Sequence, residues 1–145
     1  MMLALKRILV PTDFSETSDA ALNYGFGLVQ TFSAQLYLLH VPGKTGENFE
    51  ADFPMGQFEK MARERLELVA SPEETKQLRP EYAMRIGVPA DEIVRFASDR
   101  DIDLIVMGTH GRSGVTHMLM GSVAEKVVRE APCPVLMVRH RRRAT

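Results

Sequence analysis

The sequence lacks the features that mark several classes of protein. It has a single cysteine among 145 residues, so no internal disulfide can form and an intracellular home is expected. Its net charge of −1 gives no bulk attraction to nucleic acid. No apolar run approaches the length of a membrane-spanning helix. The apolar stretch from Met1 to Lys6 is too short for a signal peptide. We therefore expect a cytoplasmic protein that binds neither nucleic acid nor a membrane.

Two nucleotide-binding motifs are incomplete. Gly25 and Gly27 lack the third glycine of a dinucleotide fingerprint, and no strand precedes them. We attribute both to close packing of a helix against the sheet. The segment Gly43-Lys44-Thr45 resembles the end of a P-loop, but Leu38 stands where that motif requires its first glycine. The P-loop interpretation is therefore rejected.

Metal-binding and nucleophile motifs are missing as well. Asp99, Asp101 and Asp103 lack the glycine and the distal glutamate of a calcium loop. Cys133 lies between two prolines without an obvious cationic neighbour, so we interpret it as a packing thiol. No serine has a general base that the sequence identifies. We expect no metal ligands and no catalytic residues.

Apolar strands and amphipathic helices alternate along the chain. Runs rich in branched apolar residues predict buried strands at residues 6–10, 35–41, 81–86, 102–107 and 135–138. Helical spacing predicts helices at about 18–33, 58–69, 90–100 and 121–130, with a short helical turn from Ser71 to Glu74. Ala20, Ala21, Tyr24, Leu28 and Phe32 carry the spacing of the first helix. This alternation predicts an α/β domain, residues 1–140, with a parallel sheet, helices on both faces and a basic tail, residues 141–145.

Ligands of parallel sheets bind beyond the carboxyl ends of the strands, where the winding direction reverses. Three strand ends should therefore converge: Pro11-Thr12-Asp13, Val41 and Met107-Gly108. Asp13 either accepts a hydrogen bond from a ribose hydroxyl or base edge, or is the N-cap of the next helix. Val41 either offers backbone groups and an apolar wall to a purine, or is an ordinary strand terminus. The spacing leaves both pairs of alternatives open.

The stretch from Met107 to Val123 joins a predicted strand to a predicted helix and is rich in glycine. Gly108 and Gly111 bracket two residues, and Gly121 follows after nine more. Such a loop lets backbone N–H groups turn towards an anion beside the positive end of the helix. This pattern predicts a phosphate-holding loop.

Two side chains in this stretch have alternative roles. Ser122 and Glu125 fit a capping box, so Ser122 either caps the helix or, with the N–H of Val123, faces a phosphate. Arg112 either adds positive charge to bound phosphates or points to solvent.

Several segments resemble the universal stress protein family. Residues 6–15 resemble the start of its domain, and residues 103–114 resemble its glycine loop. Residues 119–127 and 133–138 resemble its last helix and strand. The pattern of Gly108, Gly111 and Gly121-Ser122 is that of the ATP-binding branch and is complete. The resemblance covers nearly the whole chain and is weakest from Pro42 to Pro80, where Ser71-Pro72 interrupts a helix that is usually longer.

The resemblance implies a single-domain, five-stranded parallel sheet of the adenine nucleotide alpha hydrolase-like fold, in strand order 3-2-1-4-5. It implies a homodimer through the last strand, Val135 to Val138. It also implies that the protein binds ATP, or AMP or ADP, with Mg²⁺ or Mn²⁺ carried on the nucleotide. Taken with the strand ends, the expected nucleotide-binding residues are Pro11, Thr12, Asp13, Val41, Met107, Gly108, Gly111, Arg112, Gly121, Ser122 and Val123.

The function that the resemblance implies is nucleotide-dependent regulation in the stress response, through a protein partner that the sequence does not identify. One alternative is a slow, metal-assisted ATP hydrolase in which Asp13 or His110 assists. Another is a nucleotide-independent dimeric interaction module, in which the glycine loop is only structural.

Overall fold

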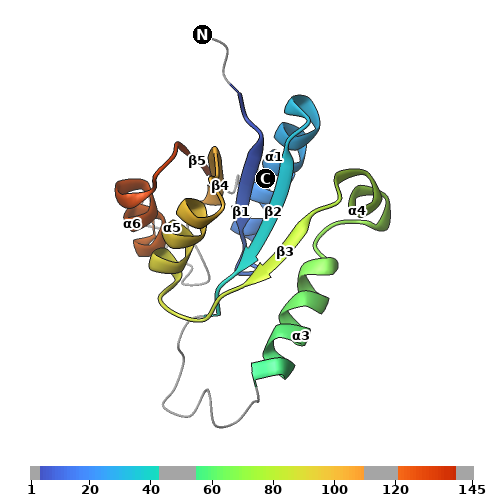
Figure 1. Ribbon diagram of the computed structural model, residues 1–145, viewed down its shortest axis with the longest axis horizontal. Coiled ribbons are helices and arrows are strands. Elements are labelled where there is room, and N and C mark those ends of the chain that lie inside the picture. The colour runs from blue at the N-terminus through green and yellow to red at the C-terminus, as the bar shows by residue number, and fades with distance from the viewer. Residues whose placement is uncertain (1–3, 43–54, 110–120, 140–145) are drawn as a thin grey trace, which may run out of the picture.

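A parallel sheet with helices on both faces forms the body of the molecule (Figure 1). The computed structural model describes residues 4–42, 55–109 and 121–139. In chain order the elements are β1 (Arg7–Pro11), α1 (Glu16–Phe32), β2 (Gln35–His40), α3 (Met55–Glu67), α4 (Pro72–Leu78), β3 (Glu81–Met84), α5 (Pro89–Asp99), β4 (Leu104–Gly108), α6 (Ser122–Glu130) and β5 (Val135–Val138). The predicted alternation of strand and helix is confirmed, and the ends of the five strands and of α1, α3, α5 and α6 lie within three residues of those predicted.

The sheet winds in two directions from its centre. Its five strands lie in the order β3-β2-β1-β4-β5, and every neighbouring pair is parallel. The chain runs outward from β1 through β2 to β3, then returns to β4 and continues to β5. The winding direction therefore reverses between β1 and β4, which is where ligands of this architecture bind. The predicted fold class and strand order are confirmed.

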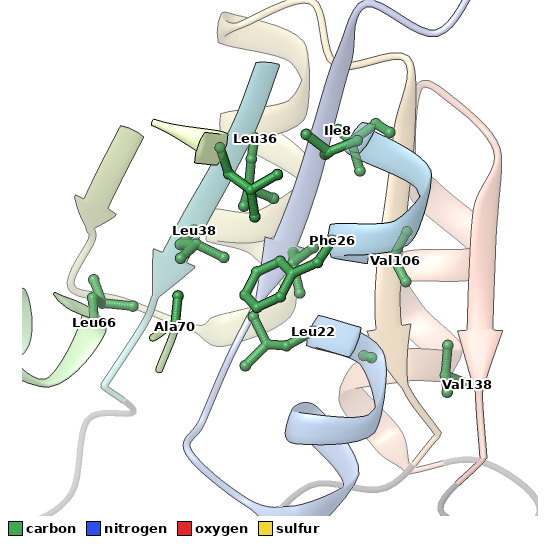
Figure 2. Close-up of a cluster of buried hydrophobic side chains, with 13 residues drawn as sticks. Ile8, Leu22, Phe26, Leu36, Leu38, Leu66, Ala70, Val106 and Val138 are labelled. Atoms are coloured by element: carbon green, nitrogen blue, oxygen red, sulfur yellow. The ribbon is translucent and has the colours of Figure 1, made fainter. Parts of the chain in front are cut away.

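Two apolar clusters cover the two faces of the sheet. Alternation along β1 sends Ile8 and Val10 to one face and Leu9 to the other, and all three are fully buried. Figure 2 shows the first cluster, in which side chains of α1 meet those of the strands. Its labelled members are Ile8, Leu22, Phe26, Leu36, Leu38, Leu66, Ala70, Val106 and Val138. Helices α5 and α6 supply Ile93, Phe96 and Val127 to the second cluster.

The buried face of α1 differs from the one that apolar spacing indicated. Tyr24 and Phe32 are 57% and 40% exposed. The face against the sheet consists of Ser18, Ala21, Leu22, Gly25, Phe26 and Val29. Small residues allow α1 to approach the sheet closely: a Cβ at Gly25 would lie 2.6 Å from Cγ2 of Val10. Close packing therefore explains Gly25, but the same explanation is wrong for Gly27, which is exposed with nothing within 4 Å.

The interruption at Ser71-Pro72 produces a second helix, α4, rather than a brief turn. The Ser71 hydroxyl accepts the N–H of Glu74 at 3.1 Å, and the Glu74 carboxylate accepts the N–H of Ser71 at 2.9 Å. Pro72 occupies the first helical turn, where its missing N–H costs nothing. This reciprocal capping box explains why a chain that has just left α3 starts a new helix at once.

Candidate functional site

Polar side chains hold the turn between β1 and α1. Oδ1 of Asp13 accepts the Ser18 hydroxyl at 2.6 Å and the Ser15 N–H at 3.0 Å. The N–H of Asp13 donates to Ser18 Oγ at 3.2 Å, and that of Phe14 to Thr12 Oγ1 at 3.0 Å. The N-cap of α1 is Ser15, whose hydroxyl accepts the N–H of Ser18 at 3.3 Å. The interpretation of Asp13 as the N-cap is therefore wrong, although its carboxylate is fixed by the same turn.

The rings of Phe14 and His40 and the guanidinium of Arg65 pack together next to this turn. Phe14 has φ of 65°, a conformation that residues other than glycine rarely adopt. Its ring centroid lies 4.5 Å from that of His40 at the end of β2, and the Arg65 guanidinium lies 4.1 Å from it. Nδ1 of His40 is 2.8 Å from the carbonyl oxygen of Thr12, so this nitrogen carries the proton and donates. His40 lies within the strand predicted at residues 35–41, and nothing in its spacing indicated this contact.

The ends of β2 and β4 bring apolar side chains to the same edge of the sheet. Val41 follows β2, Met107 lies near the end of β4, and Val123 lies in the first turn of α6. All three pack against the apolar cluster shared with α5 and α6. Val41 and Val123 are half-buried, whereas Met107 is only 6% exposed. The predicted residues Val41, Met107 and Val123 therefore belong to one apolar cluster on this face of the sheet.

Gly108 ends β4 directly against the first turn of α1. A Cβ at this position would lie 2.5 Å from Cγ2 and 2.9 Å from the carbonyl oxygen of Thr17. The backbone oxygen cannot move without disturbing α1, so no side chain fits here. Gly108 is thus needed for packing between β4 and α1, a role additional to the one the glycine pattern predicted.

One hydrogen bond joins the two ends of the glycine loop. Thr109, which is 5% exposed, donates its N–H to the carbonyl of Val138 at 3.1 Å. The N–H of Gly121 then donates to the carbonyl of Thr109 at 2.6 Å. The predicted residues Gly111 and Arg112, with His110, lie outside the described residues. The structure therefore fixes where the loop leaves the sheet and where it enters α6.

The N-terminus of α6 has no side-chain cap among the described residues. Its N-cap is Gly121, with extended backbone angles of φ −73° and ψ 165°. Ser122 is already the first helical residue, so the predicted capping box with Glu125 is wrong. The Glu125 carboxylate instead lies 3.9 Å from Arg129, one turn further along the helix. Among the described residues no side chain caps the first-turn N–H groups, which lie at the positive end of the helix dipole.

The predicted residues that the structure describes lie at the carboxyl edge of the sheet, around the point where its winding reverses (Figure 1). Pro11 and Thr12 are buried there, and the Thr12 hydroxyl already accepts the N–H of Phe14. These two residues therefore shape the turn. Asp13, by contrast, is only half-buried.

Other chemistry-bearing groups lie away from this edge. Burial raises the pKa of the Cys133 thiol, and the nearby negative charge of Asp103 raises it further. A thiol with a raised pKa is a poorer nucleophile at neutral pH, in agreement with a packing role. Residues 4–42, 55–109 and 121–139 contain no group of three or more His, Cys, Asp or Glu placed to hold a metal ion. Within the same ranges, no helix combines the length and apolarity needed to cross a membrane.

Sheet order, reversal point and flanking helices define an adenine nucleotide alpha hydrolase-like fold. The model of the universal stress protein family matches residues 4–139, and the chain belongs to this family. It is similar to universal stress protein MJ0531 of Methanocaldococcus jannaschii, with 36% identity over 139 residues, 92% of this chain and 82% of that protein.

Solved structures of related proteins share the fold along nearly the whole chain. The structure of MJ0577, from the same archaeon, has a TM-score of 0.80 and 31% identity. It covers 97% of this chain and 99% of its own. A universal stress protein in complex with cAMP has a TM-score of 0.64 and 25% identity. It covers 94% of this chain and 98% of its own.

Proposed function

We propose that the protein binds ATP at the carboxyl edge of its sheet and acts as a nucleotide-dependent regulator in the stress response. The observation that carries this proposal is the N-terminus of α6. Its first-turn N–H groups have no side-chain cap among the described residues, and the N–H of Gly121 ties that helix end to Thr109, the residue after β4. A helix end of this kind, at the reversal point of a parallel sheet, suits a phosphate group.

The nucleoside is recognised by the neighbouring strand ends. Hydrogen bonds from Ser15 and Ser18 fix the Asp13 carboxylate, which then accepts a ribose hydroxyl without first losing side-chain freedom. Val41 presents its backbone groups to adenine, and its side chain belongs to the same apolar wall as Met107. An apolar wall with a few fixed polar groups is the usual composition of a small-molecule site.

The phosphates lie against the start of α6. The N–H groups of Ser122 and Val123, together with the exposed Ser122 hydroxyl, donate to phosphate oxygens. In this proposal Gly111 and Arg112 complete the cradle from the glycine loop. Mg²⁺ or Mn²⁺ is carried by the phosphates themselves, because the described residues offer no group of three ligands for it.

Two further findings support the class of ligand and the assembly. A relative with 25% identity over nearly the whole chain was solved with cAMP, an adenine nucleotide.

At the opposite end of the sheet from β3, β5 pairs only with β4 among the described residues, and Leu136 on it is 38% exposed. We propose that this edge pairs with a second copy to form a homodimer in the cytoplasm. The protein partner that reads out nucleotide occupancy is not identified by these features.

We propose that the site holds ATP and does not turn it over at an appreciable rate. The same Asp13 oxygen that accepts the Ser18 hydroxyl also accepts the Ser15 N–H. An oxygen that already accepts two hydrogen bonds is held as a fixed acceptor and is poorly placed to take a proton from an attacking water.

Isothermal titration calorimetry with ATP and with AMP tests the site. Gly121→Val keeps an extended backbone angle that valine adopts readily, but it places a branched side chain where the phosphates would lie. We expect ATP affinity to fall by at least about 100-fold, the equivalent of losing two charge-assisted hydrogen bonds. The matched control is Gly27→Val, because Gly27 is exposed with open space around it.

A second pair of variants examines the nucleoside side. Asp13→Ala should weaken ATP and AMP binding by roughly 10-fold to 100-fold, while Asp19→Ala, on the exposed first turn of α1, should leave affinity within about threefold. Melting curves must accompany Asp13→Ala, since it also removes the acceptor for Ser15 and Ser18. Gly121→Val therefore decides the assignment: unchanged ATP affinity in that variant would refute it. A wild-type protein whose melting temperature does not rise with excess ATP would instead be a nucleotide-independent module.

A further inference from the structure

A groove is lined by residues of α3 and β3. Strand β3 lies at the other end of the sheet from β5 (Figure 1). The cavity has a volume of about 440 Å³, which is within the range of pockets that hold a ligand. Glu59, Lys60 and Arg63 line it from α3, and Tyr82 and Met84 line it from β3. A helix and a strand edge therefore form its two walls.

Strand β3 lies at one edge of the sheet, and its outer side pairs with no other strand among the described residues. Among the described residues β3 pairs only with β2, and the N–H of Arg85 donates inward to the carbonyl of His40 at 3.1 Å. Backbone groups of a parallel strand alternate in direction, so Ala83 faces β2 as Arg85 does. Tyr82 and Met84 then direct their N–H and C=O groups outward. An edge of this kind is a template for another strand.

The hydroxyl of Tyr82, which lines the same groove, is buried and has no hydrogen-bond partner among the described residues. Buried tyrosine hydroxyls usually find a partner, and one left without any costs about 1–3 kcal/mol. The ring itself is held in place, because Tyr82 packs against the first apolar cluster and the Arg63 guanidinium lies 5.5 Å from its centroid. The hydroxyl is therefore a fixed donor that lacks an acceptor.

The charges of the groove favour an acidic partner. Lys60 and Arg63 face one carboxylate, that of Glu59, along the lining. Lys60 makes no ion pair within residues 4–42, 55–109 and 121–139. Arg63 pairs with Glu67 at 3.1 Å, but both side chains are about half exposed or more, so this pair is weak. An arriving carboxylate can thus recruit both cations.

We propose that this groove binds an extended, acidic peptide segment of a partner protein. The segment adds to β3 as a further strand and exchanges main-chain hydrogen bonds with Tyr82 and Met84. The Tyr82 hydroxyl donates to a carbonyl or carboxylate oxygen of the segment, and an acidic side chain lies beside Lys60 and Arg63. This surface is formed by other elements than the proposed nucleotide site, so either proposal can fail without the other.

Fluorescence anisotropy with the full chain tests the proposal. The probe is a labelled eight-residue peptide in which glutamate alternates with valine or threonine, and the control peptide carries lysine in place of glutamate. Met84→Pro removes only the outward N–H and is compatible with an edge strand, whereas Met84→Ala shortens the side chain and keeps the N–H. We expect about tenfold weaker binding for Met84→Pro and at most about threefold for Met84→Ala.

Tyr82→Phe provides a test that does not touch the backbone. It removes the hydroxyl alone, so the variant should melt at or above the wild-type temperature and bind the peptide about fivefold more weakly. Equal affinity for the lysine peptide would overturn the proposal, as would unchanged binding by a folded Met84→Pro variant. Competition by free glutamate as effective as that of the peptide would assign the groove to a small anion instead. A dimer in light scattering that Met84→Pro dissociates would assign it to a second copy of this chain.

Discussion

Two helices begin at the carboxyl edge of the sheet on either side of the reversal point, and their first turns are completed differently. The first turn of α1 is closed by its own chain: Ser15 caps it, and Asp13 and Ser18 bond to each other. The first turn of α6 starts from Gly121 and has no side-chain cap among the described residues. A single fold thus contains one helix start with a side-chain cap and another that has none among the described residues.

The two helix starts differ in whether their turn is held by side-chain hydrogen bonds. A closed turn fixes backbone and carboxylate geometry, and it even holds Phe14 at φ of 65°, a strained conformation of the kind that concentrates at functional sites. An open end keeps donors available for an anion. Helix α5 also lacks a side-chain cap, but Pro89 removes one N–H, and Asp91 and Glu92 place carboxylates in its first turn. Helix α6 also has a carboxylate in its first turn, that of Glu125, but no proline there, and in our proposal it is the start that takes the phosphate.

The largest expected effect is on ATP affinity and comes from giving α6 a side-chain cap. Gly121→Asp gives α6 a carboxylate cap, which should raise the free energy of unfolding by about a few tenths of a kcal/mol. The same charge repels phosphate, so ATP affinity should fall by at least about 100-fold. Gly121→Asn is the matched neutral control, with a cap but no charge, and should lose about tenfold. Calorimetry and thermal melts check both, and an Asp variant that binds ATP normally would refute the open-end account.

Removing the side-chain cap of α1 should lower the free energy of unfolding and leave ATP affinity almost unchanged. Ser15→Ala removes the cap of α1 and should cost about 1 kcal/mol of unfolding free energy. ATP affinity should stay within about threefold, because the Asp13 carboxylate keeps its bond to Ser18. Ser71→Ala breaks the capping box of α4, far from the proposed site, and provides a control with a similar loss of stability. Urea unfolding measures the free energy of unfolding of both variants. A much larger loss of ATP affinity in Ser15→Ala than in Ser71→Ala would contradict the claim that the α1 cap serves stability and not nucleotide binding.

The smallest effect concerns the pairing of α6 with α5. Nζ of Lys126 lies 2.6 Å from Oδ1 of Asp91, and this hydrogen bond raises the pKa of Lys126 above its ordinary 10.5. A raised pKa in the folded state means that the pair stabilises the protein below pH 10.5 and loses this contribution as the pH rises through the folded value. The melting temperature of wild type should exceed that of Asp91→Asn by a constant margin from about pH 7 to about pH 9. Above pH 10.5 the margin should shrink, and a margin that grows there would contradict this assignment.

Two serine-containing patterns show how far the sequence could predict these helix ends. Ser71 and Ser122 each precede a glutamate by three residues, yet only Ser71 forms a capping box. Pro72 sets the first turn after Ser71. In α6 the carbonyl of Gly121 accepts the N–H of Glu125 at 3.0 Å, so Gly121 is the N-cap, and its own N–H is held by the carbonyl of Thr109. That bond joins residues far apart in sequence, so local spacing could not reveal it.

Other features of the fold also fall into those that local spacing predicts and those that depend on tertiary contacts. Alternation of strands and helices was enough to predict the parallel sheet, because short apolar runs and helical spacing are local properties. The buried face of α1 was predicted only in part, since Gly25 packs on Val10 while Tyr24 is exposed. The contact of Gly108 with Thr17, and that of His40 with Thr12, depend on tertiary neighbours and were not predicted.

The most direct test of the contrast between α1 and α6 is a titration of ¹⁵N-labelled protein with ATP, followed through the backbone amide signals. The account predicts large shifts for Ser122, Val123 and Ala124, whose N–H groups would donate to phosphate. The amides of Glu16, Thr17 and Ser18, in the first turn of α1, should shift much less. Equal shifts at both helix ends, or shifts confined to α1, would contradict the claim that α6 alone is open to the nucleotide.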